Sequence, residues 1–541
     1  MNRFLVMIFL WVAGGVSYCQ VNRYMVFFTN KNNLSYSLDN PGAFLSQRAL
    51  DRRKNQGIAL SASDLPVNPD YVSGVQALGA QVFYSTRWFN GVLIQCQDSL
   101  TKKIDSLSFV KKVEYVAPGA RPMRVSRDSA RYQSTITEKM NSLTNEVQND
   151  MLGMDTMHLE GYTGDGVLIA VLDVGFPGVD GSEYFRHLFT GNKILGERDF
   201  VTGSPDVYHS DSHGTEVLSC IAADKPGIYE GAAYNASFIL CITEDDLTEY
   251  RVEEYNWVFG AEYADSLGVD IISSSLGYNI FDDTTMNYTY AQMNGNTAVI
   301  TRAADLAAAR GILCVVSVGN DGNDSWKKLV APADADSVIS VGAVDANLQH
   351  AFFSSYGPSS DGRVKPEVAA LGYPTALVGP VNNLTYGVGT SYSTPLVSGL
   401  AAGLWQAYPG LTNMELRQVI EKGSSNYNHP DSLTGFGIPD FKKIKFVITA
   451  LSQEMPGNLY KVYPNPVLEK RLYVQYRHDL SGLPLEVGIF NTSGKSCFSS
   501  RFTMNREEDK IELDLENLSS GIYILLLHSP GGAGKVKLLI P

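Results

Sequence analysis

Three side chains far apart along the sequence have the types needed for acyl transfer: Asp173, His213 and Ser391. A serine hydroxyl can attack a carbonyl carbon, an imidazole can accept its proton near neutral pH, and a carboxylate can orient that imidazole. Each residue also has an ordinary structural explanation. Asp173 can begin a turn before a glycine, His213 can lie on the surface beside a serine, and Ser391 can cap a helix. The catalytic interpretation therefore depends on whether the fold brings the three together.

The elements around these residues predict that they meet at one edge of a sheet. In the long middle of the chain, near-continuous apolar runs alternate with helical patterns, which indicates a parallel sheet covered by helices on both faces. The predicted strands are 167–172, 237–242, 269–273, 312–317 and 338–341. Asp173 directly follows the first of them. Active sites of open α/β sheets collect at the carboxyl ends of their strands.

Helix starts are predicted at the other two residues. A helical pattern at 216–223 follows His213, so the ring can point away from the sheet and into a cleft. Glycines precede Ser391 and permit a close approach of the backbone, and Pro395 is tolerated in a first helical turn. The start of that helix would present free N–H groups and the positive end of its dipole to an oxyanion at Ser391.

Asn320 is a fourth candidate side chain. It follows the strand predicted at 312–317, so its amide can point at a negative charge that develops near the same edge of the sheet. The run Asn320-Asp321-Gly322 is also good turn chemistry, and a structural turn is the competing explanation.

Together these motifs resemble the subtilisin family of serine peptidases. They are Asp173-Val174-Gly175, His213-Gly214-Thr215, Ser275-Leu276-Gly277, Gly319-Asn320, and Gly389-Thr390-Ser391 with Pro395. Their order of Asp, His, Asn and Ser is the order of that family. The resemblance implies a subtilisin-like α/β fold, with a mostly parallel sheet covered by helices on both faces, over residues 149–448. It also implies a serine-type endopeptidase that acts on polypeptides.

The resemblance assigns a role to each candidate. Ser391 would form the acyl-enzyme, His213 would act first as general base and then as general acid, and Asp173 would orient the imidazole. Asn320 would bind the oxyanion together with the Ser391 N–H.

Ser275, Leu276 and Gly277 would form the edge on which a peptide lies as an added strand. This chemistry requires no cofactor, and the sequence implies no metal site. A structural calcium is compatible with the resemblance, but the sequence does not locate one.

Four residues beside these motifs depart from the family pattern. Val174 stands where Ser or Thr is usual, and Tyr392, Ser393 and Leu396 replace the commoner Met, Ala and His of the serine motif. No triad position is lost, so we interpret the changes as altered packing beneath the nucleophile. They leave the substrate specificity open.

The length and net charge of the chain limit the classes of partner that it is expected to bind. A chain of 541 residues is long enough for several domains. Its net charge of -14 disfavours an electrostatic grip on nucleic acid or anionic lipid. The basic cluster Arg52-Arg53-Lys54 is short, and we expect it to be solvated. No apolar run after the N-terminus is long enough to predict a membrane span.

Residues 1–19 have the pattern of a secretory signal. Arg3 precedes an apolar run at 4–16, and cleavage is expected after Cys19. A membrane anchor is the weaker interpretation because the run is shorter than the roughly 20 residues that span a bilayer. A lipoprotein interpretation centred on Cys19 is disfavoured by the bulky Tyr18 before it.

A first folded unit is predicted at 20–117. Its pattern gives strands at 23–29, 80–84, 90–96 and 110–116 and helices at 41–56 and 99–106, an order compatible with a small split βαβ sandwich. It resembles an inhibitory propeptide. The polar linker 118–148, with Arg121, Arg124, Arg127 and Arg131, is the expected region of the maturation cut.

The last segment, 457–541, is predicted to be a small β-sandwich. Short alternating strands are expected at 472–476, 485–490, 511–515, 522–527 and 535–540. With Tyr463-Pro464-Asn465-Pro466 and Gly521-Ile522-Tyr523, it resembles the C-terminal sorting domain of the type IX secretion pathway in Bacteroidetes. The secretion machinery would then be a partner, and the protein would be secreted or attached to the cell surface after crossing both membranes. A generic accessory β-sandwich is the alternative.

Cys220, Cys241 and Cys314 stand in apolar runs and are interpreted as small buried hydrophobes, with a disulfide among them left open.

The acidic stretch 244–254 is expected to be a solvated helix start. The less favoured alternative is that it lines the cleft and selects basic substrates. Two other functions use the same fold: an inactive surface protein that binds a partner, and a transpeptidase or ligase.

Overall fold

The computed structural model describes residues 21–119 except 33–34, residues 145–451, and residues 459–540 except 478–479, 492–494, 506–509 and 531. The signal segment 1–19 and its cleavage site at Cys19 lie outside the described residues. So does most of the linker 118–148, including its four arginines. The chain divides into two compact units between Phe441 and Lys442.

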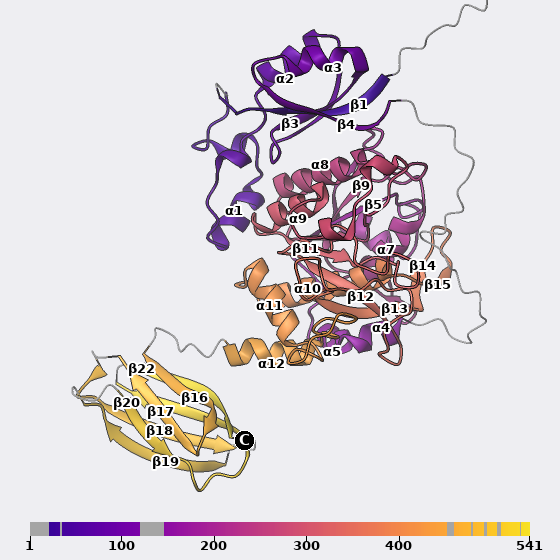
Figure 1. Ribbon diagram of the computed structural model, residues 1–541. Helices are drawn as coiled ribbons and strands as arrows, with labels where there is room; N and C mark the ends of the chain where they lie inside the picture. The colour runs from indigo at the N-terminus through magenta and orange to yellow at the C-terminus, as the bar shows by residue number, and fades with distance from the viewer. Residues whose placement is uncertain are drawn as a thin grey trace, which may run out of the picture. The chain divides into compact units, whose positions relative to one another are not determined.

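A seven-stranded parallel sheet forms the middle of the first unit (Figure 1). Its strands lie in the order β13-β12-β11-β10-β5-β9-β6. Their bounds are β5 (Leu168–Asp173), β6 (Ile194–Asp199), β9 (Ser237–Ile242), β10 (Ile271–Ser274), β11 (Leu313–Ser317), β12 (Ile339–Asp345) and β13 (Val368–Tyr373). The predicted parallel sheet is confirmed, and its five predicted strands are the five inner ones.

Helices cover both faces of this sheet, as predicted (Figure 1). Helices α8 (Val252–Leu267) and α9 (Val299–Ala308) lie on one face, and α7 (His213–Ala222) and α10 (Thr390–Ala407) lie on the other. Helix α10 packs across β10 to β13 and is buried from Thr390 to Trp405. Gly399 is required there, because a Cβ on it would lie 2.2 Å from the Cβ of Ala232.

Shorter elements complete the middle of the chain. They are α4 (Glu146–Met151), α5 (Met154–Leu159), α6 (Arg186–Thr190), α11 (Asn413–Lys422) and α12 (Phe441–Leu451), with the strand pairs β7 (Asp224–Lys225) and β8 (Tyr229–Glu230), and β14 (Thr375–Val378) and β15 (Leu384–Gly387). Helix α12 spans the division between the two units.

The N-terminal region folds into a four-stranded antiparallel sheet in the order β2-β3-β1-β4. Its elements are β1 (Val21–Phe28), α1 (Gln47–Asn55), α2 (Pro69–Ala77), β2 (Gln81–Thr86), β3 (Gly91–Gln97), α3 (Asp98–Asp105) and β4 (Val110–Pro118). Helix α2 was not predicted, although Asn68 caps it and Pro69 begins it.

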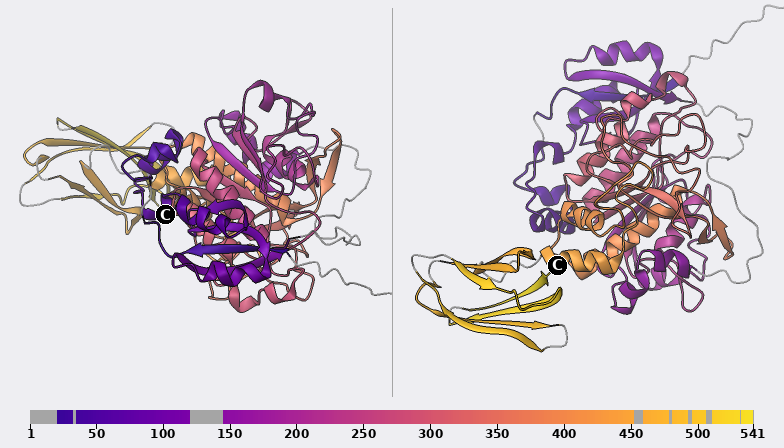
Figure 2. Two further views of the ribbon diagram at one scale, coloured as in Figure 1. Left: turned by 90° about the horizontal axis from the view of Figure 1, so that it is seen from above. Right: turned by 60° about the horizontal axis from the view of Figure 1, so that its bottom comes forward.

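This small sheet is buried on both faces. In β1, Tyr24, Val26 and Phe28 pack into one core together with side chains of α2 and α3. Met25, on the opposite face, joins the core that contains α8. Since successive side chains of a strand point to opposite faces, one strand serves both cores. Figure 1 shows the N-terminal sheet beside α8, and Figure 2 shows the N-terminal region, in indigo, against the middle of the chain from two further sides.

The second unit is a β-sandwich, as predicted for the C-terminal segment. One sheet has the order β16-β17-β20 and the other β19-β18-β21-β22. The strands are β16 (Tyr460–Leu468), β17 (Arg471–Tyr476), β18 (Pro484–Asn491), β19 (Ser496–Thr503), β20 (Lys510–Asp514), β21 (Gly521–Ser529) and β22 (Gly532–Ile540). Side chains of both sheets share one buried core. Strands β16 and β19 were not predicted.

In the described part of the chain, none of the helices is long and apolar enough to cross a membrane. The described cysteines carry free thiols: Cys96, Cys220, Cys241 and Cys314 are buried, and Cys497 is exposed.

Candidate active site

The carboxyl ends of three neighbouring strands carry most of the candidate residues. Strands β11, β10 and β5 are adjacent and parallel. Asp173 is the last residue of β5, Ser275 directly follows β10, and Asn320 lies three residues beyond β11. Because parallel strands end at the same edge, three segments far apart in the sequence converge there.

Asp173 and His213 are joined directly. The Nδ1–H of His213 donates to Asp173 Oδ1 at 2.7 Å, and both side chains are buried. His213 is the first residue of α7, and its backbone N–H donates to Asp211 Oδ1 at 2.9 Å. A carboxylate can only accept, so this contact places the imidazole proton on Nδ1 and makes Nε2 the basic nitrogen.

Burial and charge act in opposite directions on His213. Burial lowers the pKa of its imidazole, but Asp173 raises that pKa, and the carboxylates of Glu216 and Asp211 add to the effect. The net pKa of His213 is raised. The site therefore stabilises the imidazolium that forms when His213 accepts a proton.

Ser391 is the second residue of α10, and its backbone is tied to the end of β10. The Ser275 hydroxyl donates to the Ser391 carbonyl oxygen at 2.8 Å, and the Ser391 hydroxyl donates to the Ser275 carbonyl at 3.4 Å. In a regular helix the N–H of residue 395 would donate to the Ser391 carbonyl, but Pro395 has none. Ser275 supplies the missing donor. Pro395 thus lies in the second turn of the helix. The predicted position in the first turn is wrong.

The side chain of Asn320 is held in one orientation. Its Oδ1 accepts from the Thr390 N–H and from the Thr390 hydroxyl, both at 2.9 Å. Because both contacts supply donors, the oxygen of the amide must face Thr390. The Nδ2 hydrogens are therefore directed to the other side of the amide.

The remaining candidate residues line one cavity of about 70 Å³. Ser391, Asn320, Ser275, Leu276 and Gly277 all line it. The ring of Tyr392, the residue after Ser391, lies 6.0 Å from the His213 ring between centroids. The nucleophile candidate, the amide candidate and the predicted substrate edge thus share one cavity.

Comparison with known proteins agrees with this geometry. A family model described as "Subtilase family" matches residues 164–437, just over half of the chain. The chain belongs to the subtilase family. It is thereby a serine peptidase of family S8, as the sequence motifs predicted.

Two further family models match outside the subtilase region. "Peptidase S8 propeptide domain, Bacteroidota" matches residues 23–133, and "Secretion system C-terminal sorting domain" matches residues 461–541. Both predicted resemblances, to a propeptide and to a sorting domain, are confirmed. The subtilase is therefore made as a precursor.

Individual relatives support the same assignment. Subtilisin DY of Bacillus licheniformis is 31% identical over 280 residues, which cover 51% of this chain and 90% of the relative. Subtilisin E of Bacillus subtilis (strain 168) is 32% identical over 271 residues, covering 49% of this chain and 62% of the relative. A crystal structure of an epidermin leader peptide processing serine protease from Staphylococcus aureus has the same fold, with a TM-score of 0.55 and 17% identity over 79% of this chain and 99% of that one.

The four departures from the usual subtilase motifs are all buried. The backbone N–H of Val174 donates to Asp173 Oδ1 at 2.8 Å, and the valine side chain has no donor to add. Among the described residues, Asp173 Oδ2 has no hydrogen-bond partner. Ser393 and Leu396 are fully buried in α10. Tyr392 is also buried, and its hydroxyl donates to Glu216 Oε2 at 2.6 Å. The sequence did not identify Glu216, although it lies one helical turn after His213.

Two expectations about charged residues were wrong. Glu253 and Glu254 were expected in a solvated helix start, but both are fully buried at the start of α8. Burial raises the pKa of Glu254 to about 7, and Glu254 accepts from the Tyr288 hydroxyl at 2.8 Å. Arg52 and Arg53, expected to be solvated, are buried against Asp265.

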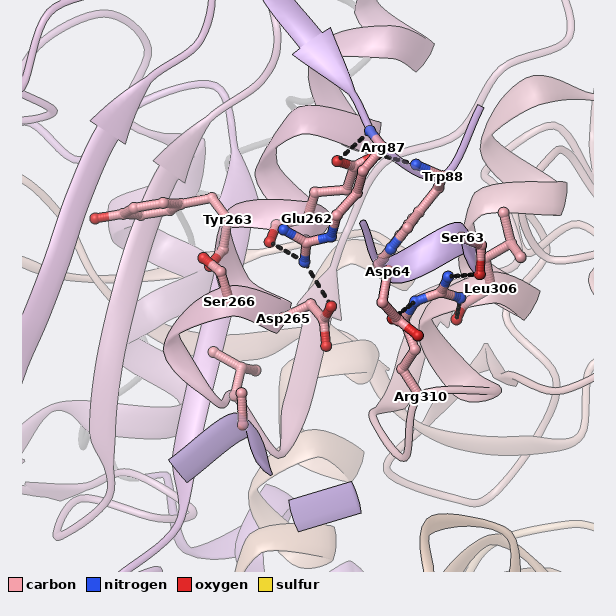
Figure 3. Close-up of polar contacts among 12 residues, drawn as sticks. Ser63, Asp64, Arg87, Trp88, Glu262, Tyr263, Asp265, Ser266, Leu306 and Arg310 are labelled. Carbon is pink, nitrogen blue, oxygen red and sulfur yellow. Dashed lines mark hydrogen bonds and ion pairs between the residues drawn. The ribbon is translucent and has the colours of Figure 1, made fainter. Parts of the chain in front are cut away.

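The N-terminal region contacts α8 through two carboxylates of this helix (Figure 3). Glu262 accepts from the Thr86 hydroxyl and from the backbone N–H groups of Arg87 and Trp88, at 2.5, 2.9 and 3.1 Å. These contacts fix the end of β2 against the helix. A larger cavity of about 570 Å³ lies beside this contact, and none of the candidate catalytic residues lines it.

Asp265, one turn further along α8, is the centre of a buried ionic cluster. Its carboxylate accepts from Arg52, Arg53 and Arg87, all three from the N-terminal region, at 2.5, 2.9 and 2.6 Å. Although burial alone would raise it, these cations lower the pKa of Asp265 to about 2. Asp64 connects Arg53 to Arg310 at 3.1 and 3.2 Å, and Figure 3 shows the contacts of Arg87 and Arg310.

No group of three or more His, Cys, Asp and Glu side chains in the described part of the chain is placed to hold a metal ion. A structural calcium, compatible with the resemblance, is not located.

Proposed function

We propose that this subtilase is a secreted endopeptidase that hydrolyses peptide bonds in proteins through an acyl-enzyme on Ser391. His213 takes the hydroxyl proton on Nε2 and returns it to the leaving amine, and Asp173 holds the imidazole through Nδ1. Asn320 Nδ2 and the Ser391 N–H bind the oxyanion.

The observation that carries this proposal is the shared cavity. Ser391, Asn320 and the segment Ser275 to Gly277 line the same space. The ring of Tyr392, the residue after Ser391, lies 6.0 Å from the ring of His213, which is hydrogen-bonded to Asp173. An extended peptide that pairs with residues 275–277 would bring its carbonyl carbon to Ser391, and the pinned amide of Asn320 would face the developing negative charge.

A covalent probe tests this function directly. We expect a fluorophosphonate to label the matured wild type, and Ser391→Ala to abolish both labelling and hydrolysis of a protein substrate. Ser393→Ala is the matched control, because Ser393 lies two residues along the same helix and its hydroxyl donates to the Thr390 carbonyl at 2.9 Å. Labelling that persists in Ser391→Ala would contradict the assignment of the nucleophile.

The same test separates two other functions. An inactive surface protein that only binds a partner would not be labelled after maturation. A transpeptidase or ligase would be labelled but would pass the acyl group to an amine. The masses of the products from one peptide, with and without an added amine, distinguish hydrolysis from ligation.

We further propose the order of the precursor. Residues 1–19 direct export, residues 20–117 inhibit the enzyme until the linker 118–148 is cut, and residues 149–448 are catalytic. Residues 457–541 engage the type IX secretion machinery, which would place the protein outside the cell or on its surface. The contacts of Glu262 and Asp265 with the N-terminal region support its attachment to the catalytic region, which an inhibitor made in the same chain requires.

A further inference from the structure

The cavity beside Ser391 is small for a site that accepts a side chain. Its volume of about 70 Å³ is half of the roughly 150 Å³ of an apolar cavity that accommodates benzene. An aromatic ring therefore does not fit into it without rearrangement. The cavity lies between the segment that contains Gly277 and the segment that contains Gly319, both of which line it.

Val330 fills the space between these two glycines. A Cβ on Gly277 would lie 2.3 Å from Val330 Cγ2, and a Cβ on Gly319 would lie 3.0 Å from the same methyl group. Because glycine has no side chain, neither Gly277 nor Gly319 narrows the cavity. The size of the cavity is therefore set by the side chain of Val330.

The backbone holds Val330 in place. Its N–H donates to the Val318 carbonyl at 3.1 Å, next to Gly319. The following residue, Ala331, exchanges two hydrogen bonds with Tyr278, next to Gly277, at 2.8 and 3.2 Å. Because the segment is paired with both walls and Val330 is 3% exposed, the side chain cannot swing out of the cavity easily.

A polar group in the lining also disfavours large apolar side chains. Asn279 is 4% exposed, and its Nδ2 has no hydrogen-bond partner among the described residues. An apolar side chain that filled the cavity would exclude water and leave this donor unsatisfied, which is unfavourable.

We propose that Val330 determines the specificity of the enzyme and restricts the residue before the scissile bond to glycine, alanine or serine. This inference rests on the proposed function, because it takes the cavity beside Ser391 as the site of that residue. The substrates are then polypeptides with small side chains at the position of cleavage.

A peptide series on the enzyme matured from the full chain tests this inference. The peptides differ only in the residue before the scissile bond, which is Ala, Ser, Leu or Phe. We expect kcat/KM for the Ala and Ser peptides to exceed kcat/KM for the Leu and Phe peptides by at least about tenfold. A difference of one methylene group in a closed pocket already changes kcat/KM by about this factor. Equal or better cleavage of the Phe peptide by the wild type would overturn the inference.

Two variants assign the effect to Val330. We expect Val330→Ala and Val330→Gly to raise the ratio of Phe to Ala cleavage at least about tenfold. Val338→Ala, which removes the same two methyl groups from a fully buried valine that does not line the cavity, should leave the ratio unchanged. Active Val330 variants with the wild-type ratio would contradict the inference, whereas hydrolysis that persists in Ser391→Ala would contradict the proposed function instead.

Discussion

The hydroxyl of Tyr392 donates to Glu216 Oε2 at 2.6 Å, and Tyr392 is the residue next to Ser391. The same tyrosine ring lies 6.0 Å from the His213 ring between centroids. Glu216 is also one of the carboxylates that raise the pKa of His213, together with Asp173 and Asp211. One hydrogen bond therefore connects the helix of Ser391, the proposed nucleophile, with the electrostatics of His213, the proposed general base.

Replacing Glu216 should change the pH dependence of the enzyme. Glu216→Gln removes a negative charge that raises the pKa of His213, so the pKa falls and the base stays deprotonated at lower pH. We expect the acid limb of the kcat/KM profile to move down by roughly 0.3 to 1 pH unit. Tyr392→Phe should move it in the same direction, because the lost hydrogen bond raises the pKa of Glu216. An unmoved acid limb in both variants would leave the pair with a packing role only.

Asn320→Ala should slow the chemical step and spare the fold. The variant loses the Nδ2 donor, and we expect kcat to fall by about 10² to 10³, the magnitude known for the equivalent change in subtilisin itself. KM should change little, since the interaction forms with the oxyanion. Because the variant also frees Thr390, its melting temperature is the necessary control. A folded variant with unchanged kcat would remove Asn320 from the oxyanion site.

Asp265→Asn should release the N-terminal region after the linker is cut. In a Ser391→Ala chain nicked between residues 120 and 144, the cleaved fragment is held by contacts that include three arginines on one buried carboxylate. Removing one partner of a buried ionic group costs about 3–5 kcal/mol, so the dissociation constant should rise by about 10² or more. Size-exclusion chromatography of the nicked chain measures whether the fragment coelutes.

The control for that experiment lies at the same contact. Arg48 pairs with Asp270 and donates to the Gly268 and Gly166 carbonyls at 3.0 and 2.9 Å, but its side chain is 43% exposed, and an exposed ion pair contributes only about 0–1 kcal/mol. Arg48→Ala should therefore change the dissociation constant less than Asp265→Asn does. Equal effects of Asp265→Asn and Arg48→Ala would show that the buried cluster is not the main anchor.

Glu254→Gln should change how stability depends on pH. The pKa of Glu254 is raised to about 7 in the folded protein, so the favourable protonated state is present below its unfolded pKa and is lost as the pH rises through about 7. Glutamine stays neutral throughout. We expect the free energy of unfolding of the variant, relative to the wild type, to rise by about 2 kcal/mol between pH 5 and pH 8. Denaturant unfolding of Ser391→Ala chains measures this difference, with exposed Glu146→Gln as the control.

The sequence predicted the five inner strands of the sheet, and the positions of Asp173 and Asn320 near strand ends, because both leave local signals. Strands that are buried on both faces read as apolar runs, and β5 is buried at all six positions. The edge strand β6 left no such signal, because it is only partly buried and contains Gly196, Glu197 and Arg198. Edge strands tolerate such residues. β13 is buried at its first five positions, but its apolar run is only four residues long and ends in Gly372 and Tyr373.

What the sequence could not predict depends on partners from distant segments. Glu254 is buried because Tyr288 and the Ile300 N–H reach it. Arg52 is buried because Asp265, more than 200 positions away, faces it. Val330 is only an apolar residue until the fold places it between two glycines. In each case the local pattern is ordinary, and the tertiary contact alone gives the residue its role.

Removal of the N-terminal region leaves Glu262 and Asp265 without their partners and opens this stretch of α8 to water. The departing segment 21–119 carries more Lys and Arg than Asp and Glu, so the shortened protein is more acidic than its precursor. Maturation should therefore delay elution from an anion-exchange column, which offers a simple way to separate the two forms.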